Sequence, residues 1–189
     1  HTYTIQWVGP MNYDEYRKYI RDEETLDPGM FNLYYFEARQ DKRHKWHTYI
    51  GIHKQNDGID KRVNLSHEHL APFIKNGAKE LRIWIGSFAN PRDQKDINID
   101  LVETLFIKAY HERLTENEKK KGSLPKSSVC VINSYYDTNE KKIRSKCDKP
   151  MSFDDVLIYL EESNCFMHGN LAKMNGVIYV RKLGRVRNS

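Results

Sequence analysis

Apolar and polar residues alternate along several short stretches of the chain, and a period of two predicts β-strands. Two such stretches, NLYYFEA (32–38) and WHTYIGI (46–52), flank the polar segment RQDKRHK (39–45), which predicts an antiparallel hairpin with a long polar loop. LRIWIGSF (81–88) alternates as a third strand, and VCVINSYY (129–136) closes this unit as a final short strand. The pattern therefore predicts a sheet whose strands are rich in aromatic residues.

Helical periodicity is clearest in two other stretches. Residues 98–117 repeat apolar side chains at helical spacing and predict the longest helix of the chain. Residues 13–24 follow Asn12, and Glu15 three positions later completes a capping-box pattern, which predicts the start of a helix.

Three further stretches complete the expected elements. Residues 60–78 have helical spacing, with Pro72 as a position at which the helix could split. Residues 153–163 (FDDVLIYLEES) predict a capped helix, followed by a strand at 176–183, and residues 3–8 predict a short strand near the start.

Composition indicates a folded protein whose excess positive charge lies in one part of the chain. Aromatic residues make up 12% of the 189 residues, which argues against disorder, and no apolar run approaches the length that spans a membrane. The net charge of +5 is concentrated in residues 141–189, which contain 10 Lys and Arg against 5 Asp and Glu. A basic appendage attracts nucleic-acid backbones, although a solvated surface with surplus lysine explains it equally well.

The cysteines indicate a reducing compartment. Cys130, Cys147 and Cys165 are odd in number and widely spaced, so they fit neither a disulfide framework nor a CxxC zinc site. We therefore expect reduced thiols in a cytoplasmic protein.

Together these elements predict an α/β (α+β) protein. Its core would be a small, mainly antiparallel three-stranded sheet flanked by helices, in the order β-β-α-β-α. We expect an N-terminal strand–helix extension (1–30), the core itself (31–138) and a basic helix–strand appendage (139–189).

At an ordered set of positions this core resembles the GIY-YIG nuclease family. NLY (32–34) stands where the GIY tripeptide would be, with asparagine in place of its glycine, and YIG (49–51) matches the second signature after a somewhat long spacer. KRV (61–63) resembles the family's arginine-bearing helix, and IDLVETLFIKAY (99–110) resembles the helix with its metal-binding glutamate. The resemblance spans residues 31–135 and implies a nuclease core.

The resemblance implies a catalytic set made of Tyr34, Tyr49, Arg62, His69, Glu103 and Asn133. Glu103 would hold Mg²⁺ or Mn²⁺, because a hard cation that keeps most of its waters needs only one or two carboxylates besides substrate oxygens. Arg62 offers a planar, permanently charged fork to a phosphate. Tyr34 or Tyr49 would orient or activate the attacking water.

Simpler interpretations stand beside these roles. The two tyrosines suit cross-strand packing, a lone arginine suits a solvated surface, and Glu103 could lie on the exposed face of its helix. The family's terminal asparagine has two candidates, since Asn133 fits by its place in a strand and Asn117 fits by spacing. We favour Asn133.

Two histidines follow Arg62 on the expected helix. Position 69, seven residues after Arg62, returns to the same helical face, which favours His69 as a phosphate or leaving-group contact and leaves His67 at the surface. Ser66 occupies the place, one turn after the arginine, where the family often has His or Tyr. Because histidines at i and i+2 of a helix do not converge on one metal, we reject a zinc site.

These inferences predict a metal-dependent endonuclease that acts on double-stranded DNA and has no membrane association. A restriction-type, sequence-specific enzyme is the first expectation, dimeric if its target is palindromic. A structure-specific repair nuclease and a nucleic-acid-binding module without cleavage are the alternatives. The sequence leaves open the recognition site and the choice between DNA and RNA.

Overall fold

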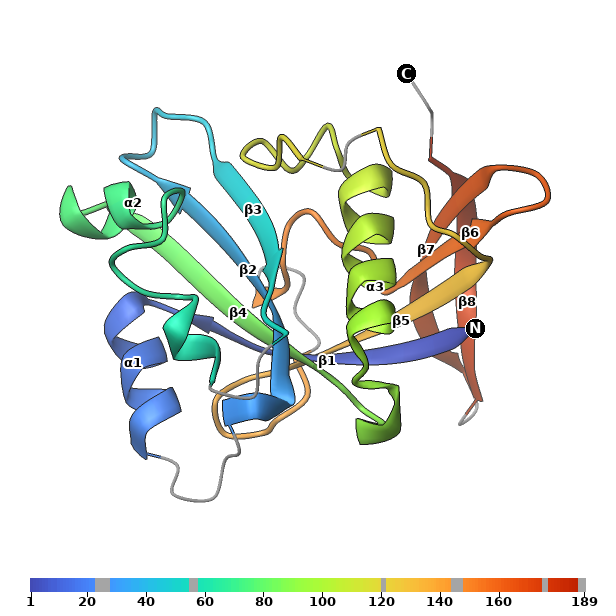
Figure 1. The fold of residues 1–189 in the computed structure, drawn as a ribbon, viewed down its shortest axis with the longest axis horizontal. Helices are drawn as coiled ribbons and strands as arrows, with labels where there is room; N and C mark the ends of the chain where they lie inside the picture. Colours follow the sequence, from blue (N-terminus) through green and yellow to red (C-terminus); the bar gives the residue numbers. More distant parts are fainter. Residues whose placement is uncertain (23–27, 55–57, 120–121, 144–147, 175–176, 187–189) are drawn as a thin grey trace.

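The computed structural model describes residues 1–22, 28–54, 58–119, 122–143, 148–174 and 177–186. The strands are β1 (Thr2–Met11), β2 (Phe31–Arg39), β3 (His47–Ile52), β4 (Glu80–Phe88), β5 (Val129–Tyr136), β6 (Val156–Leu160), β7 (Cys165–Met174) and β8 (Val177–Arg185). The α-helices are α1 (Tyr13–Asp22), α2 (Ala71–Lys75) and α3 (Asp96–Ala109), and the short 3-10 helices are η1 (Pro28–Met30), η2 (Ile59–Lys61) and η3 (Pro91–Asp93). Figure 1 shows α3 lying across one face of the sheet. α1 and α2 lie beside β2 and β4.

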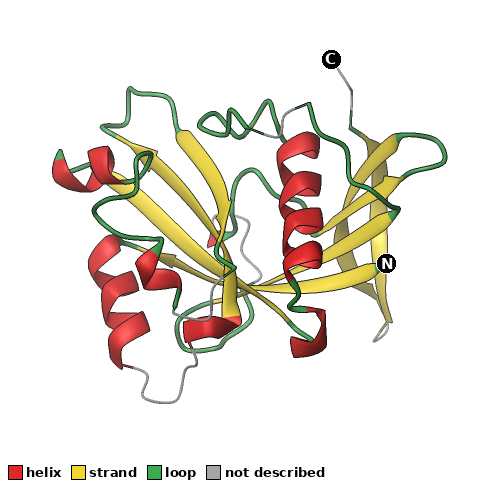
Figure 2. Cartoon of the chain, in the orientation of Figure 1, coloured by secondary structure: helices red, strands yellow, loops and turns green. Residues whose placement is uncertain are grey.

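All the named strands belong to one eight-stranded sheet with the order β3-β2-β4-β1-β5-β6-β7-β8 (Figure 2). Neighbouring strands are antiparallel except β1 and β5, which are parallel. The predicted fold class, a small three-stranded sheet flanked by helices, is therefore wrong. β3, β2 and β4 do pair as expected, but the sheet continues beyond β4, because pairing between strands so distant in sequence leaves no local signature.

The first residues of the chain lie in the middle of this sheet. Residues 1–30 were expected to form an extension, and they contribute β1, which pairs with β4 on one side and β5 on the other. The capping box before α1 is confirmed: the Glu15 amide donates to Asn12 Oδ1 at 2.9 Å, and the Asn12 amide donates to Glu15 Oε2 at 2.8 Å. The last two residues of the predicted helix, 23 and 24, lie outside the described residues.

Two predicted helices do not form as expected. Residues 60–78 contain only the end of η2, turns and the five-residue α2, because Pro72 stands in the first turn of a helix and does not fit its interior. Residues 156–160, inside the second predicted helix, form β6, which is hydrogen-bonded to β5 and β7. A short apolar run of this kind has no periodicity that separates a buried strand from a helix. β7 was not predicted at all.

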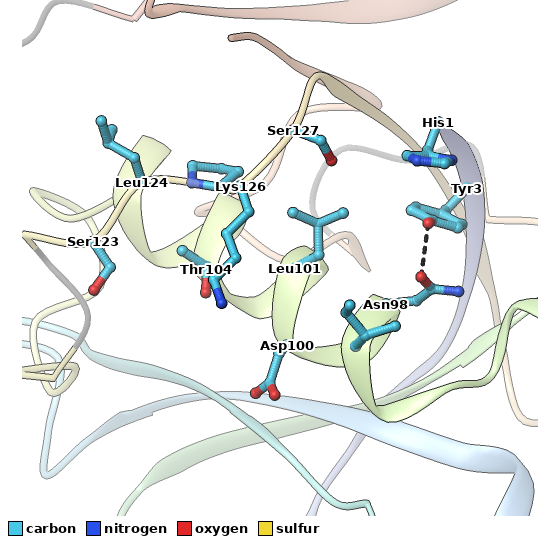
Figure 3. A pocket seen from close by; sticks show the side chains of 12 residues that line it. His1, Tyr3, Asn98, Asp100, Leu101, Thr104, Ser123, Leu124, Lys126 and Ser127 are labelled. Carbon is cyan, nitrogen blue, oxygen red and sulfur yellow. Dashed lines mark hydrogen bonds between the residues drawn. The ribbon is translucent and has the colours of Figure 1, made fainter.

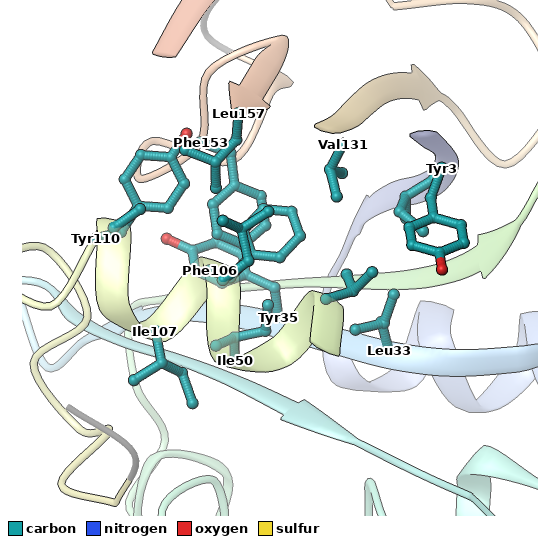
Figure 4. Packing of buried hydrophobic residues seen from close by; sticks show 14 of the residues in the cluster. Tyr3, Leu33, Tyr35, Ile50, Phe106, Ile107, Tyr110, Val131, Phe153 and Leu157 are labelled. Carbon is teal, nitrogen blue, oxygen red and sulfur yellow. The ribbon is translucent and has the colours of Figure 1, made fainter. Parts of the chain in front are cut away.

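Hydrophobic side chains pack on both faces of the sheet. On one face α3 covers β2 and β3, and Phe106 packs with Tyr35, Ile50 and Phe153, all buried (Figure 4). On the other face a second cluster joins β2 and β4 to α1, η2 and α2; it includes Tyr16, Tyr34, Phe36, Ile59, Val63 and Phe73. Because β2 is covered on both sides, its side chains are held in fixed positions.

A buried carboxyl group on β2 fastens the segment before β6. Glu37 Oε1 accepts a hydrogen bond from the Met151 amide and lies 3.1 Å from the Tyr35 hydroxyl, which also lies 2.8 Å from Ser152 Oγ. The second carboxyl oxygen lies 3.9 Å from Arg82 Nη1. Burial raises the pKa of Glu37 from its ordinary 4.5 to about 7, although the hydrogen bonds act in the opposite direction.

This raised pKa predicts how stability depends on pH. Between pH 4.5 and 7 the folded protein keeps the Glu37 proton while the unfolded chain has released it, so the free energy of unfolding should fall as pH rises, by about 3 kcal/mol in total. In Glu37→Gln this contribution is absent. Urea unfolding of both proteins at pH 5 and pH 8 should therefore show a smaller pH difference for the variant. Equal differences in the two proteins would mean that Glu37 is ionised normally in the fold.

Candidate active site

The two tyrosines of the signature stand side by side on β2 and β3. In the antiparallel register Tyr34 is opposite Gly51 and Phe36 is opposite Tyr49, so both tyrosines are on one face of the sheet. Their ring centroids are 5.9 Å apart, and the two ring planes are stacked at an angle of 29°. A Cβ at position 51 would lie 2.8 Å from Tyr34 Cε1 and closer still to the hydroxyl end of the ring. The glycine of YIG is therefore required for Tyr34 to lie across β3.

His67 is the residue that the sequence placed wrongly. It was expected at the surface, but it is buried, and its Nε2 lies 2.8 Å from the Tyr34 hydroxyl. The Leu70 amide donates to His67 Nδ1 at 3.2 Å, so the neutral ring carries its proton on Nε2 and donates it to Tyr34. Helical-face reasoning failed because residues 62–70 are turns and not a helix.

The protonation of His67 is set by its surroundings. Burial lowers its pKa to about 4, and the positive charge of Arg62 acts in the same direction. His67 is thus neutral at neutral pH, which keeps its Nε2–H available as a hydrogen-bond donor to Tyr34.

Arg62 is exposed, and its guanidinium lies beside the two tyrosines. It follows η2, and its guanidinium is within hydrogen-bonding reach of the hydroxyls of Tyr34 and Tyr49. The Tyr34 hydroxyl is the main cause that raises the pKa of Arg62. Burial raises the pKa of both tyrosines, while Arg62 lowers each of them.

The hydrogen bonds give the two tyrosines different roles. Tyr34 accepts from His67, and its own hydroxyl hydrogen bond to Tyr49 raises the pKa of Tyr34 and lowers the pKa of Tyr49. Tyr34 is fully buried and bonded to His67, whereas Tyr49 is only partly buried. Tyr49 is therefore the tyrosine that solvent can reach, whereas the sequence left the choice open.

His69 lies against Tyr49, as the predicted site requires, although a loop positions it. Its ring stacks on Tyr49 with centroids 4.8 Å apart. Its Nδ1 is 3.6 Å from Glu116 Oε2, and the other oxygen of Glu116 is 2.7 Å from His47 Nδ1. Glu116, from the segment after α3, thus connects the start of β3 to the loop that carries His69.

Glu103 is held inside the protein and not on an exposed helix face. Its side chain lies on α3 among buried neighbours, with 8% of its surface exposed. After burial, the charge of Glu103 also contributes to raising the pKa of Tyr49. α3 covers the opposite face of the sheet from Tyr34 and Tyr49, and β3, which lies between Glu103 and Tyr49, is the edge strand.

Of the two candidate asparagines, the structure brings Asn117 to the site. Its amide accepts from the Ile50 N–H at 2.9 Å and donates to the Ile50 carbonyl at 2.7 Å, so it completes the outer edge of the YIG strand. Asn133, which we favoured, lies on β5, three positions from β2 in the sheet. There it bonds Trp7 Nε1 at 2.9 Å and the Asp154 carbonyl at 2.8 Å.

The donor set around Glu103 suits one type of metal. No group of three or more His, Cys, Asp or Glu side chains in the described parts of the chain is arranged to hold an ion. A metal at this site would depend on Glu103, water and substrate oxygens. Mg²⁺ binds in this way, because it keeps several waters and uses one or two carboxylates.

A separate hollow of about 410 Å³ lies between α3 and residues 123–127. Figure 3 shows Leu101, Thr104 and Leu124 on its walls, with the Tyr3 hydroxyl donating to Asn98 Oδ1 at 2.9 Å. Asp100 at its rim is paired with Lys54. Its lining does not bring together an arginine, a histidine and a polarised hydroxyl, as the tyrosine site does, so the latter is the better candidate for chemistry.

Comparison of the chain with protein-family models, with curated proteins and with solved structures gave no match. Within the described residues, no helix has the length and apolar character needed to cross a bilayer. The function must therefore be argued from the geometry of the site.

Proposed function

We propose that this protein is a metal-dependent endonuclease of the GIY-YIG type that hydrolyses phosphodiester bonds in DNA. The observation that carries the proposal is the convergence of four segments. Residues 34, 49 and 62 bring two stacked tyrosines and an arginine together, and Glu103 on α3 is close enough to influence Tyr49 electrostatically. Packing alone explains the stacked rings, but it does not explain why an arginine lies beside their hydroxyls and why α3 buries a carboxylate.

The side chains suit the steps of phosphodiester hydrolysis, which needs an activated water and stabilisation of the charge on the phosphoryl group. Tyr49 is the less buried of the two tyrosines and is placed near Arg62, so it is our candidate for the group that takes a proton from water. Arg62 would bind the phosphoryl oxygens through its fork. Neutral His67 fixes the direction of the Tyr34 hydroxyl.

Glu103 would hold the metal. When bound there, Mg²⁺ or Mn²⁺ would supply positive charge to the phosphate and offset the effect of the carboxylate on the pKa of Tyr49. Asn117 and Gly51 act through position, since they hold β3 and leave room for Tyr34.

Within this class we propose a restriction-type enzyme for double-stranded DNA in the cytoplasm, dimeric if its target is palindromic. Cys130 and Cys165 are free thiols, which agrees with a reducing compartment, and Cys147 lies outside the described residues.

Incubation with plasmid DNA, with and without Mg²⁺, tests the proposal. Discrete fragments that require Mg²⁺ would support a sequence-specific endonuclease, and a smear would support a non-specific one. Intact DNA that migrates as a shifted band would contradict the enzyme and support a binding module.

Arg62 should matter more for the rate than for affinity. Arg62→Lys keeps the charge but loses the bidentate fork, so we expect a loss on the order of a hundredfold in single-turnover cleavage, and a greater loss for Arg62→Ala. The affinity of each variant for DNA is measured beside the rate. If both variants bind weakly but cut normally at saturating protein, Arg62 is an ordinary phosphate contact, and Arg82 is the next arginine to test.

A further inference from the structure

One end of the sheet carries a concentrated positive charge that the candidate site does not use. We define this basic end as Lys42, Arg43, Lys45, Lys75 and Lys79, all exposed. They come from the β2–β3 loop, from the end of α2 and from the residue before β4. The backbone joins the residue before β4 to the β2–β3 loop, since the Lys79 amide donates to the Gln40 carbonyl at 3.3 Å. None of the five forms an ion pair with another described residue.

The acidic groups at this end are already engaged. Asp41 accepts from the Arg43 amide at 2.7 Å and lies 3.1 Å from His44 Nδ1. Glu80 is paired with Arg39 at 2.6 Å. The charge of the basic end is therefore left for a partner from outside the chain.

The loop that supplies three of the five cations is anchored at its base. The Arg39 guanidinium lies 4.4 Å from the centre of the Trp46 ring, and the Arg82 guanidinium lies 5.5 Å from it. These cation–π contacts join the last residue of β2 to the residue before β3. The base of the loop is thus held next to the tyrosine strands.

Distance along the strands places this end near the candidate site. Trp46 precedes Tyr49 by three residues, which is about 10 Å of extended chain, or roughly three nucleotide steps along a DNA strand. The basic C-terminal strands are farther away. β7 is five positions from β2 in the sheet, which corresponds to about 24 Å.

We propose that the basic end binds the phosphate backbone of the DNA next to the scissile bond, and that the basic C-terminal strands contribute less. This inference rests on the proposed function for its choice of partner. It also changes where the protein is expected to contact the DNA backbone, because sequence charge alone indicated residues 141–189.

The test compares two triple variants that remove equal charge from the two surfaces. One is Lys42→Gln, Arg43→Gln and Lys45→Gln; the matched control is Lys173→Gln, Arg181→Gln and Arg185→Gln, all exposed positions. Both are made with Glu103→Gln, so that a labelled duplex of mixed sequence is bound without being cut. Deleting residues 141–189 is less suitable, because it removes the buried Leu157 and Phe166.

Affinity is measured as a function of salt concentration. Each lost phosphate contact lowers the slope of log affinity against log salt by about 0.9, so the loop variant should lose about 2 to 3 and the control less than 1. Thermal melting of both variants verifies folding. An unchanged slope in the loop variant, or an equal or greater loss in the control, would overturn the inference.

Cleavage by the protein with Glu103 intact, measured beside these affinities, separates this inference from the proposed function. Loop-dependent binding by a protein that never cuts with Glu103 intact would leave the surface established and the nuclease refuted. Cleavage by a protein whose salt slope is unchanged by the loop substitutions would support the nuclease and refute the proposed DNA-binding surface.

Discussion

Replacing Glu103 by Gln should stop DNA cleavage while DNA binding persists. Gln has almost the same size as Glu and lacks the negative charge that a hard cation requires. Glu103 is buried on α3 beside the core, so the change also removes a charge whose burial is costly and should not unfold the protein. Single-turnover cleavage in Mg²⁺, together with affinity for the same duplex, measures both quantities.

The matched control is Glu112→Gln, the same chemical change at an exposed position just beyond α3. It should cut at the wild-type rate. Cleavage by Glu103→Gln at near the wild-type rate would show that the metal-binding carboxylate lies elsewhere. A melting curve for each variant excludes unfolding as the cause of a loss.

Tyr49→Phe should lower the cleavage rate by roughly a hundredfold or more, which is the usual contribution of a general base. Tyr34→Phe should cost less, because it removes the neighbour of the proposed base and not the base itself. Both rings keep their stacking, but Tyr34→Phe leaves the buried His67 Nε2–H without its acceptor, so thermal melting of each variant accompanies the rates.

The pH dependence of the rate identifies the base. Burial and Glu103 raise the pKa of Tyr49 above 10, so below that value the deprotonated fraction grows about tenfold for each pH unit. The wild-type rate should therefore increase up to at least pH 9, and the increase should be lost in Tyr49→Phe. A larger loss in Tyr34→Phe, or the same slope in Tyr49→Phe, would assign the role to another group.

The sequence predicted the local elements of this fold better than their assembly. Alternating apolar residues identified β2, β3, β4 and β5, and the Asn12–Glu15 pattern identified the start of α1. Local rules failed where the signal is ambiguous: VLIYL (156–160) is apolar on both faces and forms β6. The parallel pairing of β1 with β5 joins residues far apart in sequence, which no short pattern records.

The candidate site shows the same division. The two tyrosines and Gly51 could be placed from strand register, since residues opposite each other in a hairpin share a face. His67 and Asn117 could not, because turns position the former and the segment after α3 positions the latter. Spacing from Glu103 was the one signal that indicated Asn117, and strand context outweighed it in favour of Asn133.

The central claim is that side chains from separate segments act as one catalytic centre on one phosphate. The most direct measurement is single-turnover cleavage by Tyr49→Phe, by Arg62→Lys and by the double variant under the same conditions. Residues that act as a unit are strongly non-additive, so we expect the double variant to lose little more than the worse single variant. Rate losses that multiply in full would show that Tyr49 and Arg62 act independently, and would contradict the claim.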